Sequence, residues 1–181
     1  MSFQFYISFQ FTTAFDRPHF FMSVEEQRAA ATTPVEEEEV EEEEIPEWEV
    51  KDKYGRTHLF IAAQAGRLDL VKYLVEECDA NREATNNLGN TPLHIAAFNG
   101  HLDVVKYFIE VCQMDINAPG AYGNTVLITA AEGGRHDVCE FLLEALAADP
   151  TLTNNEGMRA SHMAVLKGQT DLAIYLLNKL E

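Results

Sequence analysis

Histidine, cysteine and acidic residues are the side chains of this sequence that could support catalysis or bind a metal ion. The chain has six histidines and three cysteines, Cys78, Cys112 and Cys139, and none of the cysteines forms a Cys-x-x-Cys pair. A zinc site needs about four convergent donors. The sequence also lacks a Gly-x-x-x-x-Gly-Lys-Ser/Thr loop, a His-Glu-x-x-His pair and a Gly-x-Ser-x-Gly turn. We therefore expect no enzyme activity, no catalytic residue, and no bound metal or cofactor.

Two of the cysteines belong to a repeat instead, because Cys78 and Cys112 are 34 residues apart. The same spacing relates several sets of residues of identical or similar type: Gly55, Gly89, Gly123 and Gly157; Ala62, Ala96, Ala130 and Ala164; Gly66, Gly100, Gly134 and Gly168; Tyr73, Tyr107, Phe141 and Tyr175. Self-similarity at a fixed period of this length is typical of a solenoid. The elements of one unit therefore predict those of the others.

The second unit shows the local signals best. Thr91 is a suitable N-cap, and Pro92 suits the first helical position because its missing N–H costs nothing there. Gly100 suits the left-handed position that ends a helix, and a second helix is expected to begin near Asp103. Each unit is thus predicted to be two helices followed by an extended loop.

These residues resemble the ankyrin repeat. The run Gly89-x-Thr91-Pro92-Leu93-His94-x-Ala96-Ala97-x-x-Gly100-His101 matches that family's pattern, while the first and third units match less fully and the fourth is degraded. The resemblance implies an all-α solenoid of four stacked helix-turn-helix units with hairpin-like loops. We place this domain at residues 47–181, with units at about 52–85, 86–119, 120–153 and 154–181.

Residues 1–46 are predicted to be a disordered segment. Eight glutamates lie between Glu36 and Glu44, and such a run repels itself and has few apolar groups to bury. The run is either a solubilising tail or a site that recruits a basic partner or folds back on a basic patch. Met22 resembles an ordinary start of translation, so residues 1–21 are interpreted as an upstream extension.

The charge balance restricts the partners. A net charge of −17 opposes nucleic-acid binding, which depends on a basic patch. No stretch has the length of apolar sequence that a membrane helix needs. The odd number of cysteines suits a reducing compartment. We expect a monomeric cytoplasmic protein, also compatible with the nucleus, whose partner is another protein.

In the ankyrin family, the hairpin tips and the exposed flank of each first helix line a concave groove. The resemblance places these partner-binding residues here: Tyr54, Arg56, Leu88, Asn90, Phe98, Tyr122, Asn124 and Glu132. The function that this implies is a protein-binding adaptor, scaffold or inhibitor. Two alternatives stay open. The side chains could pack only on adjacent loops, and the acidic tail could instead shield a basic partner in a chaperone-like role.

Four further expectations concern positions in the array. His94 and His162 are predicted to form hydrogen bonds between adjacent units. Cys78 and Cys112 are predicted to be core thiols, as is Cys139. Trp48 and Val50 are predicted to cap the first unit. Ile174 and Leu180 are predicted to leave apolar surface on the last helix.

Overall fold

The structure is a computed structural model that describes residues 45–180. The predicted acidic tail and the proposed start at Met22 lie outside these residues. Within the described part the chain is helical and has no strand. Its α-helices are α2 (His58–Gln64), α3 (Leu68–Glu76), α4 (Pro92–Asn99), α5 (Leu102–Lys106), α6 (Val126–Glu132), α7 (His136–Glu144), α8 (Ala160–Leu166) and α9 (Thr170–Asn178). Three short helical segments are η1 (Glu47–Glu49), the π-helical η2 (Tyr107–Val111) and η3 (Ala121–Gly123).

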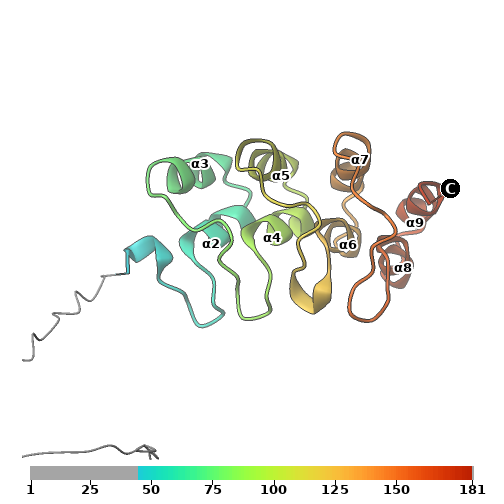
Figure 1. Cartoon of the computed structure of the whole chain (residues 1–181), viewed down its shortest axis with the longest axis horizontal. Helices are drawn as coiled ribbons and strands as arrows, with labels where there is room; N and C mark the ends of the chain where they lie inside the picture. Colours follow the sequence, from blue (N-terminus) through green and yellow to red (C-terminus); the bar gives the residue numbers. More distant parts are fainter. Residues whose placement is uncertain (1–44, 181) are drawn as a thin grey trace, which may run out of the picture. The chain divides into compact units, whose positions relative to one another are not determined.

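The helices form four pairs arranged in two rows, which confirms the predicted all-α solenoid. Helices α2, α4, α6 and α8 follow one another in an inner row, and α3, α5, α7 and α9 form an outer row (Figure 1). The inner helices make the more extensive contacts between units. Each unit therefore covers its apolar faces by packing on its neighbours.

Small residues allow the close packing of the inner row. Ala96 and Ala130 are fully buried, and Ala62 and Ala164 are buried as well. Thr57 and Thr125 begin α2 and α6, and each hydroxyl accepts a hydrogen bond from a backbone N–H of the first turn. Gly100 ends α4 with φ of 82°, as the sequence predicted.

The outer row is held together partly by aromatic side chains. The Tyr107 hydroxyl donates to Glu76 Oε1 across 2.9 Å, and the Tyr175 hydroxyl donates to Glu144 Oε1 across 3.1 Å. Burial, followed by the bond to Glu76, raises the pKa of Tyr107. The second unit differs from the prediction of one regular helix, because α5 continues into the π-helical η2. We have no physical account of this change in winding.

The last described unit exposes a position that is buried in the other units, and both ends of the array leave apolar side chains exposed. Val165 is 60% exposed, whereas Ala131 in the same position of the third unit is fully buried. Ile174 is exposed, as predicted, but Leu180 is half-buried. At the other end Trp48 packs against the core. Val50 is 54% exposed, so its predicted role in a cap was wrong.

A hairpin tip precedes each inner helix, and we call these four tips fingers 1 to 4 (residues 52–56, 86–90, 120–124 and 154–158). Each finger is closed by two backbone hydrogen bonds between its ends, for example Asn86 N to Asn90 O and Gly89 N to Asn86 O, both 3.0 Å. Figure 1 shows the loops projecting on the same side of the helix rows. The fingers and the exposed flank of the inner helices therefore share one face.

Candidate functional site

A cavity of about 230 Å³ lies between fingers 2 and 3, in front of α4 and α6. It is lined by ten residues: Leu88, Asn90, His94, Ile95, Phe98, Ala121, Tyr122, Asn124, Thr129 and Glu132. The three large apolar side chains at its edges are exposed, with exposed fractions of 63% for Leu88, 36% for Phe98 and 67% for Tyr122. We call this cavity the finger 2–3 cleft.

The cleft exists because finger 3 departs from the pattern of the other fingers. The first residue of fingers 1, 2 and 4 is Asp52, Asn86 or Asn154, and its side-chain Oδ1 accepts backbone N–H groups of its own finger. Finger 3 has Gly120 at this position, so the side-chain acceptor is missing. Its backbone instead forms the short helical turn η3.

The second residue of finger 3 also differs. Asn87 N donates to Tyr54 O, and Asn155 N donates to Tyr122 O, both across 3.0 Å, so fingers 1 and 2 are joined, as are fingers 3 and 4. Finger 3 has Ala121 in the position of Asn87 and Asn155, and its N–H is bonded to Asn90 Oδ1 at 2.9 Å. Within residues 45–180 no backbone hydrogen bond joins finger 2 to finger 3.

The separation of the fingers reflects this difference. A Cβ atom placed on Gly55 would lie 2.7 Å from Asn87 N, and one placed on Gly123 would lie 3.2 Å from Asn155 N. A Cβ atom placed on Gly89 would lie 3.9 Å from the corresponding Ala121 N. Fingers 2 and 3 are therefore the more widely spaced pair, and the cleft opens between them.

Tyr122 has an unusual backbone conformation at the tip of finger 3. Its φ is 56° and its ψ is 19°, which is the left-handed region that side-chain-bearing residues occupy only at a cost. The side chain is nevertheless exposed. Strained residues persist where the surrounding structure determines them, and they are concentrated at functional sites.

The floor of the cleft is polar and firmly held. The buried His94 ring contacts the Thr91 hydroxyl through Nδ1 at 2.8 Å and the Ala118 carbonyl through Nε2 at 3.1 Å. A carbonyl only accepts, so Nε2 carries the proton and Nδ1 accepts from Thr91. Burial lowers the pKa of His94, with opposing contributions from its backbone partners. His94 is thus neutral and connects α4 to the loop before finger 3. Thr91 and Ala118 both belong to the predicted second unit, so these two bonds do not confirm the predicted link between adjacent units.

Two further polar contacts fix the far side of the cleft. Asn154 Nδ2 donates to Asn124 Oδ1 at 2.9 Å, which links fingers 3 and 4. Glu132 Oε1 lies 3.0 Å from Lys167 Nζ, so the carboxylate in the cleft is already paired. A second cavity of about 180 Å³ continues from Tyr122 and Glu132 toward finger 4.

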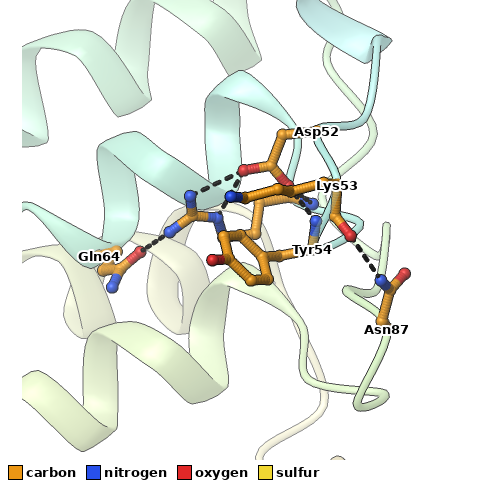
Figure 2. Close-up of polar contacts among 6 residues, drawn as sticks. Asp52, Lys53, Tyr54, Gln64 and Asn87 are labelled. Atoms are coloured by element: carbon orange, nitrogen blue, oxygen red, sulfur yellow. Dashed lines mark hydrogen bonds and ion pairs between the residues drawn. The ribbon is translucent and has the colours of Figure 1, made fainter.

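Finger 1 forms a separate cluster of charged residues around Tyr54 (Figure 2). Arg56 is paired with Asp52 at 2.7 Å, and its Nη1 donates to Gln64 Oε1 at 3.2 Å. Hydrogen bonds from Arg56 lower the pKa of Asp52. Lys53 Nζ and Arg56 Cζ lie 4.9 Å and 5.0 Å from the centre of the Tyr54 ring, within range of a cation–π interaction.

The structure brings six of the eight predicted site residues together in the finger 2–3 cleft: Leu88, Asn90, Phe98, Tyr122, Asn124 and Glu132. The other two, Tyr54 and Arg56, lie on finger 1 and do not line this cavity. Asn124 is buried, unlike the exposed groove residue that the sequence suggested. The partner-binding role of all eight stays a prediction.

Sequence reasoning missed two residues that line the cleft, Ile95 and Thr129. They lie on the inner helices three residues before the predicted Phe98 and Glu132. Ala121 differs in type from its repeat counterparts, because the finger 2 and finger 4 residues at its position are both asparagine. The combination Gly120-Ala121 was the available signal for a differently shaped finger.

The remaining histidines and cysteines do not form a second site in the described residues. His162 is exposed, and its Nδ1 accepts only from Arg159 N at 3.3 Å, so its predicted bond between units was wrong because no described unit follows it. Cys139 is fully buried, and burial raises its pKa to about 12. Cys78 and Cys112 are half-buried against the core. Among residues 45–180 no three His, Cys, Asp or Glu side chains are grouped to hold a metal ion.

None of the helices among residues 45–180 has the length and apolar character needed to span a bilayer. No curated protein sequence matches this chain. The family model described as "Ankyrin repeats (3 copies)" matches residues 38–119 and again residues 111–181. Ankyrin repeats are generally protein–protein interaction modules and are typically not enzymes. The match, together with the helix pairs and the repeat spacing of this chain, establishes that the chain belongs to the ankyrin-repeat family.

Proposed function

We propose that this protein is an adaptor or inhibitor that holds a partner protein in the finger 2–3 cleft. The observation that carries the proposal is the exposure of Leu88, Phe98 and Tyr122 around one cavity. Large apolar and aromatic side chains at the centre of a surface, with polar groups around them, are the usual anchors of an interface. Here the polar residues Asn90, Asn124, Thr129 and Glu132 line the same cavity as the three anchors.

The floor of the cleft supports the same function. His94, Asn90 and Asn124 have partners within the protein, so the cavity is shaped before a partner arrives. A site that is already formed loses less conformational entropy on binding. The exposed tip residue Tyr122 would insert between side chains of the partner while its left-handed backbone fixes its direction.

The test is quantitative affinity capture with the full chain, compared with the Phe98→Ala, Tyr122→Ala double variant. Each substitution is expected to weaken a true partner by about 1 to 3 kcal/mol without unfolding the array. Tyr73→Ala is the matched control, because Tyr73 is 57% exposed but lies on the outer helix α3. A partner that is retained equally by all three proteins would contradict the proposed function.

Salt concentration separates this function from shielding by the acidic tail. Contacts through apolar anchors should mostly persist at high ionic strength, whereas association through Glu36–Glu44 should be lost. A partner whose capture follows that run and disappears in high salt would support the shielding function instead.

A further inference from the structure

Charge is distributed unevenly over the fingers. Residues 51–56 carry three cations, Lys51, Lys53 and Arg56, and a single carboxylate, Asp52. Fingers 2 and 3 carry no charged side chain at all. The carboxylate of the cleft, Glu132, is paired with Lys167, as described above. A partner segment that crosses the fingers therefore meets positive charge on the finger 1 side of the cleft.

Among the described residues, Lys53 is the cation of finger 1 that has no ion-pair partner. Lys51 Nζ donates to Thr85 O at 3.0 Å, and Arg56 is paired with Asp52. The Lys53 ammonium lies against the Tyr54 ring and makes no ion pair with any residue in the range 45–180. Figure 2 shows the Lys53 side chain extending beside the Tyr54 ring.

Finger 1 is held in a fixed position relative to the cleft. Asn87 N donates to Tyr54 O, and Asn87 Nδ2 donates to Lys53 O at 3.1 Å. These two bonds from finger 2 hold finger 1 next to it. Packed helices are about 8–10 Å apart, and one finger precedes each pair. The cleft lies between fingers 2 and 3, so its centre is about one and a half of these spacings, roughly 12–15 Å, from finger 1. An extended chain rises about 3.3 Å per residue, so this distance corresponds to about four residues of a bound segment.

We propose that the finger 2–3 cleft and finger 1 together bind an acidic segment of a partner protein. An apolar side chain of the segment occupies the cleft between Leu88, Phe98 and Tyr122. A carboxylate about four residues away along an extended segment lies at Lys53, with Arg56 and the Tyr54 hydroxyl beside it. A cavity of about 150 Å³ accommodates benzene, so the cleft has room for a leucine or phenylalanine side chain. This inference rests on the proposed function, to which it adds the chemistry of the partner.

The test uses the full chain to select from a displayed library of short random peptides. The expected peptides carry Leu, Phe or Trp together with Asp or Glu at a roughly constant spacing. A synthetic copy of one selected peptide is then titrated against the protein and its variants by fluorescence polarisation. Circular dichroism melts confirm that each variant is folded.

Three variants separate the possible outcomes. Lys53→Glu is expected to weaken the peptide by about tenfold or more, because it places two like charges together. Lys72→Glu makes the same charge change on the outer helix α3 and should leave affinity within about twofold, since exposed charges at a distance are screened. Phe98→Ala should weaken the peptide as well.

Each contrary result has a distinct meaning. Loss of binding in Phe98→Ala with unchanged binding in Lys53→Glu would overturn the acidic segment and leave the proposed function standing. Selected peptides without an enrichment of Asp or Glu would have the same meaning. Failure to select any peptide that depends on Phe98 would overturn both.

Discussion

Exchanging alanine and valine at one repeat position would test the stacking of the units directly. Ala131 in α6 is fully buried between the third and fourth units, whereas Val165 occupies the same position of α8 and is 60% exposed. Ala131→Val adds two methyl groups to a closed contact. Overpacking of this kind costs about 1–3 kcal/mol, and the lower helix propensity of valine adds about 0.5 kcal/mol. We therefore expect a loss of about 2–3 kcal/mol.

The reverse change, Val165→Ala, should alter stability by less than about 0.5 kcal/mol, because the gain in helix propensity offsets the partial burial that is lost. The assay is urea unfolding followed by circular dichroism, with the slope checked for constancy. A domain of this kind has about 5–15 kcal/mol of stability, so a loss of 2–3 kcal/mol is readily measured. Equal effects of the two exchanges would refute the argument that Ala131 is closed off by the following unit.

Three other predictions concern buried polar groups. Tyr107→Phe should cost about 1 kcal/mol by removing the bond to Glu76. Since the folded state raises the pKa of Tyr107, the stability of the wild type should fall as pH rises above about 10. The urea midpoint of Tyr107→Phe should not show this part of the pH dependence. The lowered pKa of His94 has the opposite sign, so stability should fall as pH decreases below about 6.5. His94→Gln should remove this dependence of stability on pH, whereas the control His58→Gln, at an exposed histidine, should keep it. An unchanged pH dependence of stability in His94→Gln would count against its assignment to His94. The buried Ser161 hydroxyl has no partner within the described residues, and Ser161→Ala should raise the free energy of unfolding by about 1 kcal/mol, as measured by thermal or urea melts.

Most of the fold could be predicted from the sequence, because the repeat supplies several independent copies of each signal. Thr91, Pro92 and Gly100 mark the two ends of α4 by local conformational preference alone. The errors lie where a residue has no repeated environment. Val50 precedes the first unit and has no counterpart within the repeat, and His162 belongs to the last described unit, which no further described unit follows.

The candidate site could be predicted only in part. Leu88, Phe98 and Tyr122 were identified because they fall in exposed columns of the repeat. Their grouping into one cleft was not predictable from the columns, which treat all fingers as equivalent. It depends on the spacing between fingers 2 and 3, where the Ala121 N–H donates to the Asn90 side chain in place of the backbone bond that Asn87 and Asn155 make.

The exposure of Val165 also bears on how the molecule opens. Among residues 45–180 the fourth unit is covered on one side only, and Gly157 and Gly168 have no neighbouring atom within 4 Å of a Cβ position, unlike the corresponding Gly55 and Gly66. In a linear array each unit is stabilised by its own contacts and by its nearest neighbours. Amide protons of α8 and α9 should therefore exchange with solvent sooner than those of α4 and α6, and the solenoid should fray from its last helices inward.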